Sequence, residues 1–244
     1  MPDLRIAVLI DADNSPHSRI EAVLSEVATR GSAHVRRAYG DWTRNELKGW
    51  TGKLQENAIA PVQQFAYTKG KNASDMAMVI DAMDLLHSGE ANGFAIVSSD
   101  ADFTPLAMRL RQAGAEVLGF GQDKTPEAFV NACSQFLFLD KVRDTTSDDD
   151  DVASPLPAAR KSGKELKENP RLMQMLYAAV DAASDDDGWA DLGAIGNQIA
   201  NQSSFQPRNF GYARWSGLIE EIDKFETRRS GNHLQVRRRG GRKG

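Results

Sequence analysis

The sequence has a single cysteine, no long apolar run and few histidines. Cys133 alone excludes an intrachain disulfide and predicts a reducing compartment, the cytoplasm. No stretch approaches the roughly 18 apolar residues of a membrane span. The opening MPDLRIAVLI has too short an apolar stretch and too early an aspartate for a secretory signal. The four histidines are scattered without zinc-site spacing. Disulfide-stapled, membrane-spanning and zinc-finger proteins are therefore excluded.

Charge is distributed unevenly along the 244 residues. The formal net charge is −4, but the stretch from Arg228 to Gly244 holds seven lysines and arginines and no acid. An acidic chain with a basic end is typical of an end that meets a polyanion. A solvated end with no partner is the alternative that the sequence leaves open.

Residues 4–140 alternate short apolar runs with helical patterns. The strand candidates are LRIAVLI, AHVRRAY, PVQQFAY, GFAIVSS, EVLGF and FLFL. Strict alternation with helices predicts a three-layer α/β/α fold around a parallel sheet. We expect the strand order 3-2-1-4-5, with ligands bound at the carboxyl ends of the strands. Proline after Ser15, Thr104 and Thr125 predicts that each of these residues caps a helix.

The second part of the chain has a different character. Residues 144–167 combine an acid cluster with prolines and small residues, which predicts an acidic flexible linker. Residues 168–238 show three helical patterns followed by a hairpin around Ser230-Gly231-Asn232. This order predicts a small winged-helix-like domain. Residues 239–244 are then a basic tail.

Two Asp-x-Asp pairs follow predicted core strands. Asp11 and Asp13 come after the first strand, and Asp100 and Asp102 come after the fourth. Because strands 1 and 4 are neighbours in the expected order, Asp11 and Asp100 should face each other at one edge of the sheet. Asp75 opens a helix at the same edge, with Ser74 as its expected N-cap. Each acid taken singly has an alternative reading as a cap or turn residue.

Carboxylates that lie close together repel one another unless their negative charge is neutralised. Two unit charges 4 Å apart repel by about 4 kcal/mol at an effective dielectric near 20. Either protons stay bound or a cation is held, and all-oxygen ligands suit Mg²⁺ or Mn²⁺. Asp11, Asp75 and Asp100 are the expected metal ligands, with Asp102 as a further ligand or a water-orienting group. A metal-activated water would hydrolyse a phosphoester.

Several residues near these acids have two open readings. Asp13 either joins the site or caps the helix that begins near Pro16. Asn14 either hydrogen-bonds a ligand or a carboxylate, or is a turn residue. Ser99 either positions a phosphate or water, or satisfies backbone groups. Lys69 and Lys71, in KGKNAS, either meet substrate phosphates or face solvent.

Three motifs in order resemble the NYN domain group of PIN-like nucleases. They are IDADN, then KNASD opening a helix, then SSDADF followed by PLAMRLRQAGAEVLGFG, and the resemblance covers about residues 4–140, within an expected domain of residues 1–143. It implies a PIN-like fold and metal-dependent ribonuclease activity. The family's acids fall on Asp11, Asp75, Asp100 and Asp102, and its asparagine falls on Asn14. The chain departs from the pattern at Asp13 and in having Ser-Ser before Asp100.

The second half is similar to the LOTUS domain, also called OST-HTH. The similarity rests on DLGAIGNQIANQ and FQPRNFGYARWSGLIEEIDKFE, followed by the basic hairpin. It implies binding of RNA or of partner proteins, a homodimer included. Five arginines are expected to give salt-dependent contacts to RNA phosphates: Arg208, Arg228, Arg229, Arg237 and Arg238. Single-stranded or structured RNA is the preferred partner, and no membrane partner is expected.

The favoured function is a metal-dependent endoribonuclease with an RNA-binding module. A second reading is a haloacid-dehalogenase-like phosphatase, because DADNS resembles the Asp-x-Asp-x-Thr start of that family. Asp11 would then be the nucleophile and Asp13 the general acid, but Asp75 would have no role. The third reading is a non-catalytic RNA-binding or adaptor protein, against which the presence of all the expected acids argues.

Overall fold

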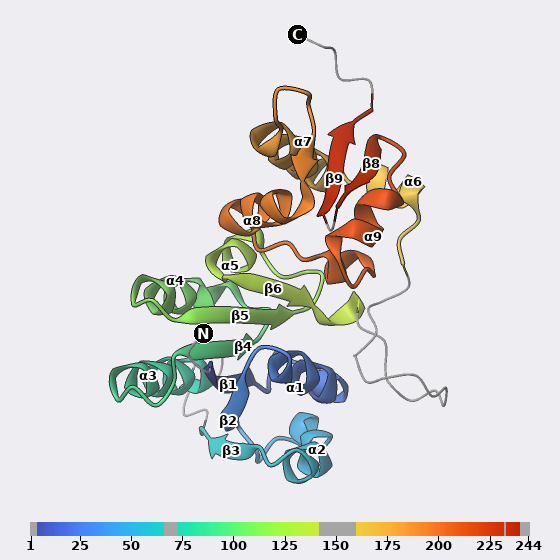
Figure 1. Ribbon diagram of the computed structural model, residues 1–244. Coiled ribbons are helices and arrows are strands. Elements are labelled where there is room, and N and C mark those ends of the chain that lie inside the picture. The colour runs from blue at the N-terminus through green and yellow to red at the C-terminus, as the bar shows by residue number, and fades with distance from the viewer. Residues whose placement is uncertain (1–3, 66–72, 142–159, 232, 240–244) are drawn as a thin grey trace. The chain divides into compact units, whose positions relative to one another are not determined.

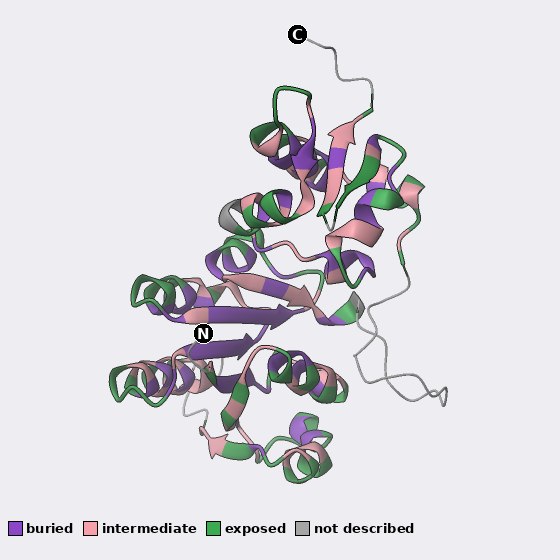
Figure 2. Cartoon of the chain, viewed as in Figure 1, coloured by how far each residue is buried: buried purple, intermediate pink, exposed green. Residues whose placement is uncertain are grey.

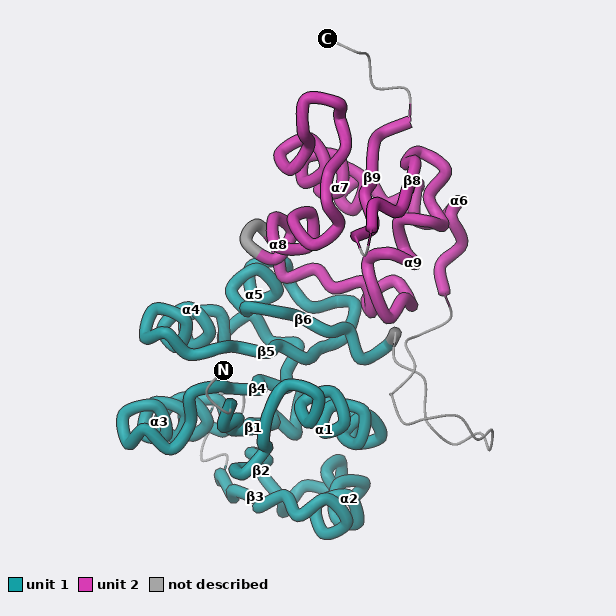
Figure 3. Tube along the Cα trace, viewed as in Figure 1, with its two compact units in different colours: residues 1–155 teal, residues 156–244 magenta. Residues whose placement is uncertain are grey.

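The structure, a computed structural model, describes residues 4–65, 73–141, 160–231 and 233–239. The chain divides into two compact units, residues 1–155 and residues 156–244 (Figure 3). Lys69 and Lys71 lie outside the described residues, as does most of the predicted linker. In the part that the structure describes, no helix combines the length and the apolar character that a membrane crossing needs.

Unit 1 is built on a parallel sheet in the order β3-β2-β1-β4-β5-β6 (Figure 1). The strands are β1 Arg5–Asp11, β2 Ser32–Gly40, β3 Ala60–Gln63, β4 Gly93–Val97, β5 Glu116–Gly121 and β6 Gln135–Phe138. The order predicted from the sequence is confirmed, and β6 extends it beside β5. Every residue of β4 is buried (Figure 2), as expected for a parallel strand covered on both faces.

Helices cover both faces of this sheet, as the three-layer prediction requires. One face carries α1 Ile20–Ala28 and α2 Trp50–Glu56, and the other carries α3 Ala73–His87, α4 Thr104–Gln112 and α5 Glu127–Ala132. Short 3-10 helices join these elements: η1 His17–Arg19, η2 Asn45–Leu47, η3 Ala101–Phe103 and η4 Leu139–Lys141. Along β1, alternate side chains enter the two cores, with Ile10 on the α1 side and Leu9 on the α3 side. Asp11 is next in the α3-side series.

The predicted capping role of Thr104 is wrong. The N-cap of α4 is Phe103, which makes no side-chain cap bond, although the proline is in the first turn as expected. The reason is that η3 runs directly into α4. The side-chain cap therefore stands one element earlier, where Asp100 accepts a hydrogen bond from the backbone N–H of Asp102.

Ser15 and Thr125 are not caps either. The hydroxyl of Ser15 donates to the Val97 carbonyl at 2.9 Å, and so ties the loop after β1 to the end of β4. The Thr125 hydroxyl donates to the Gln122 carbonyl at 2.6 Å within its own turn. Both hydroxyls thus satisfy carbonyl groups instead of helical N–H groups.

Unit 2 combines helices with a small antiparallel sheet in the order β7-β9-β8. Its elements are α6 Gly163–Lys167, α7 Pro170–Ala183, β7 Ala190–Asp191, α8 Leu192–Gln202, η5 Pro207–Phe210, α9 Trp215–Glu220, β8 Phe225–Ser230 and β9 His233–Arg238. The three helical patterns and the hairpin are confirmed as α7, α8, α9 and β8–β9. Helix α6 falls in the stretch predicted to be linker, and its Leu166 is fully buried in the unit's core. The end of that stretch is therefore folded.

The last strand also shortens the predicted basic tail. Val236 of β9 is fully buried, and the backbone N–H of Arg239 donates to the Lys224 carbonyl at 2.8 Å. Arg239 therefore belongs to the folded domain, and residues 240–244 of the predicted tail lie outside the described residues.

The single cysteine is part of the core of unit 1. Cys133 is 1% exposed, and burial raises the pKa of its thiol to about 12. The thiol therefore stays protonated and shielded at neutral pH.

Candidate functional site

Asp11, the last residue of β1, is the most buried acid of the candidate site. It is 1% exposed, and its carboxylate accepts hydrogen bonds from the Ser98 hydroxyl at 2.8 Å and the Asn14 side-chain amide at 2.9 Å. The Asn14 backbone N–H donates at 3.2 Å. Burial nevertheless raises the pKa of Asp11, because these donors offset only part of the desolvation. Asn14 therefore hydrogen-bonds a carboxylate, which is one of the two roles expected for it.

Ser98 joins the ends of β1 and β4. Besides donating to Asp11, its hydroxyl oxygen accepts from the Asp100 backbone N–H at 3.0 Å. Ser98 is fully buried, so it holds the loop of Asp100 against Asp11. Ser99 serves the neighbouring strand, since its hydroxyl oxygen accepts from the Gln122 N–H at 2.9 Å. This contact matches the backbone-satisfying reading of Ser99.

Asp75 shows that the acids converge. It lies in the first turn of α3, and its pKa is raised to about 6. Burial is the largest cause, followed by the charges of Asp11, Asp100, Asp102 and Asp13. The structure therefore brings all four predicted metal ligands, and Asp13 as well, to one edge of the sheet.

Asp13 belongs to this edge and does not cap a helix. Its carboxylate forms an ion pair with Arg44, at 3.0 Å from Nη1 to Oδ1, and accepts a hydrogen bond from Ser74. The helix after Pro16 has no side-chain cap, so the capping alternative is wrong. The capping role of Ser74 is also wrong, because α3 already begins at Ala73. Sequence reasoning missed Arg44, since a loop arginine carries no signal of its own.

The carboxylates fit a divalent cation in charge and donor type. Mg²⁺ and Mn²⁺ prefer oxygen ligands, and a cation would remove the repulsion that raises the pKa of Asp75. As the side chains are placed, however, the described residues include no group of three His, Cys, Asp or Glu that could hold a metal ion. Binding a single ion between three of the carboxylates would therefore require side-chain rotation at this edge.

Three arginines of the β8–β9 hairpin differ in their partners. Arg237 and Arg238 form ion pairs of 2.6 Å with Glu226 and Asp181, respectively. Arg228 instead hydrogen-bonds the neutral Gln235 side chain at 2.8 Å. Its guanidinium carbon lies over the Trp189 ring, 4.0 Å from the centroid. In these contacts, therefore, no acid neutralises the positive charge of Arg228.

Comparison with protein families assigns both halves of the chain. The sequence profile of the NYN domain matches residues 5–140, which is more than half of the chain. The chain belongs to the NYN domain family. The profile of the OST-HTH/LOTUS domain matches residues 167–237. Both resemblances seen in the sequence are confirmed.

Individual relatives add little to this assignment. No curated protein matches the chain. A crystal structure of a protein of unknown function from Vibrio parahaemolyticus is similar, with 18% sequence identity and a TM-score of 0.46. That match covers 56% of this chain and 93% of the other.

The NYN domain should show a pH-dependent stability that comes from Asp75. Its folded pKa of about 6 exceeds the ordinary 3.8, so the folded state keeps a proton that the unfolded state releases between these values. Raising the pH through this window therefore lowers the free energy of unfolding of the metal-free protein. In EDTA and below about pH 4, Asp75→Asn should melt at the same temperature as wild type. Above about pH 6 it should melt at a higher temperature than wild type, because only wild type then carries the charged Asp75. A melting-temperature difference that does not change with pH would contradict this account.

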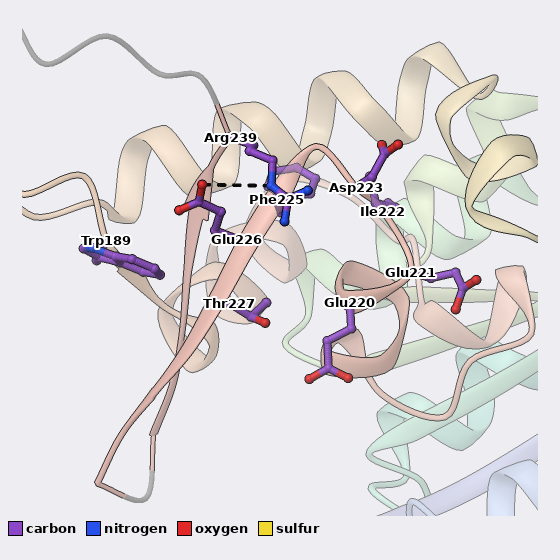
Figure 4. Close-up of a pocket in the computed structure, with 9 residues that line it drawn as sticks. All are labelled: Trp189, Glu220, Glu221, Ile222, Asp223, Phe225, Glu226, Thr227 and Arg239. Atoms are coloured by element: carbon purple, nitrogen blue, oxygen red, sulfur yellow. Dashed lines mark ion pairs between the residues drawn. The ribbon is translucent and has the colours of Figure 1, made fainter.

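The OST-HTH domain contains a pocket of unfavourable charge for RNA. Four of its nine lining residues are acidic: Glu220, Glu221, Asp223 and Glu226 (Figure 4). Arg239 also lines the pocket and lies 3.9 Å from Glu226, measured between Nε and Oε1. A polyanion would be repelled at this pocket.

Proposed function

We propose that the protein is a metal-dependent endoribonuclease in which the NYN domain cleaves RNA and the OST-HTH domain holds it. The observation that carries this proposal is the gathering of carboxylates at one sheet edge, where Ser98 bridges Asp11 and the Asp100 loop and where burial and neighbouring charges raise the pKa of Asp75 to about 6. Membership of the NYN family supports a nuclease. A structural role alone would not explain why a protein keeps five mutually repelling acids at one sheet edge.

The site residues have distinct tasks in this proposal. A bound divalent cation supplies an activated water and stabilises negative charge on the phosphoryl oxygen. Ser98 and Asn14 fix the Asp11 carboxylate so that its orientation is set before substrate arrives. Asp102, an exposed acid within η3, has the task of orienting the attacking water in this proposal.

The test is RNA cleavage with and without metal. Labelled single-stranded and structured RNAs are incubated with the protein in Mg²⁺ or Mn²⁺, and parallel samples contain EDTA. We expect internal cleavage that EDTA abolishes and that added metal restores. Cleavage that persists in EDTA would sink the metal-dependent mechanism. Tight RNA binding without cleavage in either metal would favour the adaptor alternative.

The environment of Asp11 disfavours the phosphatase alternative. A nucleophilic carboxylate must reach a phosphorus atom, but Asp11 is 1% exposed and accepts three hydrogen bonds. The general acid of that mechanism would be Asp13, which is ion-paired with Arg44. Turnover of phosphomonoesters in preference to RNA would reverse this judgement.

The proposed RNA-binding role of the OST-HTH domain rests on its basic hairpin and on Arg208 of η5. The proposed contact residues are Arg208, Arg228, Arg229, Arg237 and Arg238. Of these, Arg228 and the exposed Arg229 form no ion pair with an acid among the contacts described above. They should therefore contribute more binding energy than Arg237 and Arg238, whose charges are partly neutralised.

Replacing Arg228 should weaken RNA binding more than replacing Arg238. The slope of log affinity against log salt is negative, because salt weakens phosphate contacts. We expect Arg228→Ala to reduce the magnitude of this slope by about 0.7, the value for one contact to single-stranded nucleic acid. The Arg238→Ala slope should change less, because Asp181 pairs with that arginine. Fluorescence anisotropy at several salt concentrations measures both slopes. Equal slopes for all three proteins would place the RNA elsewhere.

The contribution of the tail is tested by a chain that ends at Arg239. Removing residues 240–244 deletes Arg242 and Lys243 but keeps β9 intact. A chain ending at Gln235 would not be informative, because it would lose the fully buried Val236. If the shorter chain keeps the wild-type affinity at every salt concentration, the tail is a solvated end.

A further inference from the structure

The acidic edge of the NYN domain poses an electrostatic problem for any RNA substrate. Five carboxylates repel the phosphates that must approach them. A bound cation removes part of this repulsion, but the phosphates beside the scissile group need a positive partner of their own. The structure provides a cation at this edge that the sequence did not indicate, namely Arg44.

Arg44 is presented by an ordered loop at the carboxyl end of β2. β2 pairs with β1 up to Asp11, so the two strands end at the same edge. The loop is fastened to β3 by Asp41, whose carboxylate accepts from the Gln63 side-chain amide at 2.9 Å. It is also fastened by the indole N–H of Trp42, which donates to the Val62 carbonyl at 3.1 Å. The position of the Arg44 backbone is therefore well defined.

The side chain of Arg44 is held but not buried. Nη1 donates to Asp13 at 3.0 Å, and Nε lies 3.6 Å from Glu46. The side chain is 48% exposed, so part of it is open to solvent. Because the guanidinium has five N–H donors in a planar arrangement, it can contact Asp13 and a phosphate at the same time.

We propose that Arg44 binds an RNA phosphate beside the acidic cluster, and that Asp13 is the positioning residue that holds it. The proposal rests on the proposed ribonuclease function, because it names a substrate contact of the same site. It also gives Asp13 a task that differs from metal ligation. Asp13 orients the guanidinium, while Asp11, Asp75, Asp100 and Asp102 form the cluster that the metal would neutralise.

RNA binding without metal tests the Arg44 contact directly. Affinity for a single-stranded oligonucleotide is measured in EDTA at several salt concentrations for wild type, Arg44→Ala, Arg44→Lys and Arg109→Ala. Arg109 is the matched control, since it is exposed in the last turn of α4, away from the helix end that adjoins η3. We expect Arg44→Ala to bind about five- to tenfold more weakly. The magnitude of its salt slope should fall by less than the roughly 0.7 of an unpaired arginine, because Asp13 and Glu46 partly neutralise Arg44. Arg44→Lys should recover part of the affinity, and Arg109→Ala should match wild type.

A double-mutant cycle tests the role of Asp13. If Asp13 only holds Arg44, Asp13→Asn should raise KM with kcat close to wild type, and its effect should vanish in the Arg44→Ala background. A loss of cleavage in Asp13→Asn as large as that in Asp11→Asn, with RNA affinity unchanged, would make Asp13 part of the metal site and overturn the positioning role.

The outcomes separate this proposal from the function on which it rests. If wild type cleaves RNA and Arg44→Ala has wild-type affinity and salt slope, the phosphate contact is refuted while the nuclease stands. If wild type fails to cleave but Arg44→Ala still loses affinity and slope, the contact stands and the catalytic function fails.

Discussion

Asp11→Asn is expected to reduce metal-dependent RNA cleavage by roughly a thousandfold or more, the scale of losing a group that acts in the transition state. The substitution keeps the size of the side chain but removes its negative charge. Asp11 is the most buried of the acids, and its carboxylate oxygens bond both Ser98 and Asn14. The rate is measured with the same RNA and metal for variant and wild type.

Stability distinguishes lost chemistry from lost folding in Asp11→Asn. Asparagine removes the buried charge whose desolvation raises the pKa of Asp11, but its amide keeps only one acceptor oxygen for the donors of Ser98 and Asn14. The melting temperature of the variant is therefore measured beside its rate, and the rates are compared per folded molecule. Asp84→Asn is the control, since Asp84 is exposed on α3 and the charge change is identical. Cleavage within tenfold of wild type in Asp11→Asn, a limit of about 1.4 kcal/mol, would remove Asp11 from the mechanism.

Asp81→Ala should lower the free energy of unfolding of the NYN domain by about 2–3 kcal/mol, the cost of leaving buried and charged partners unsatisfied. Asp81 of α3 accepts hydrogen bonds from the Tyr39 hydroxyl and the Arg37 guanidinium. Tyr39 is 1% exposed, so its hydroxyl would lose its acceptor in a position that water reaches poorly. Urea denaturation followed by circular dichroism measures the change, with Asp84→Ala as the exposed control on the same helix.

Substitutions of Asp81 and Asp75, which both lie on α3, should therefore change the stability of the domain in opposite directions. Asp75→Asn should stabilise the metal-free protein and abolish metal-dependent chemistry, whereas Asp81→Ala should destabilise the fold. Once the fraction unfolded is taken into account, the turnover of Asp81→Ala should equal that of wild type. If Asp81→Ala were as stable as wild type, the Arg37–Tyr39–Asp81 cluster would not contribute to the fold.

The sequence predicted those features that depend on backbone patterns. Continuous apolar runs such as IAVLI marked buried strands, and strand–helix alternation then fixed the parallel sheet and the adjacency of β1 and β4. That adjacency was enough to expect Asp11 and Asp100 at the same edge.

The sequence failed where side chains choose between several partners. The carboxylate of Asp13 pairs with Arg44, which lies 31 positions further along the chain. No local pattern distinguishes this pairing from a helix cap. The contact between Ser98 and Asp11 was not predicted either, because a serine between a strand and an Asp-x-Asp pair carries no local sign of its partner. Such choices are decided by tertiary neighbours that a linear pattern does not contain.

The burial of Cys133 makes the chain suitable for thiol labelling without further engineering. Its protonated, enclosed thiol should not react with maleimide under native conditions, although it remains intact in the core. Cysteines introduced at the exposed positions Asp84 and Asp186 would then carry a fluorophore pair, one on the NYN domain and one on the OST-HTH domain. Energy transfer between these dyes would report how the separation of the two domains changes when RNA is added.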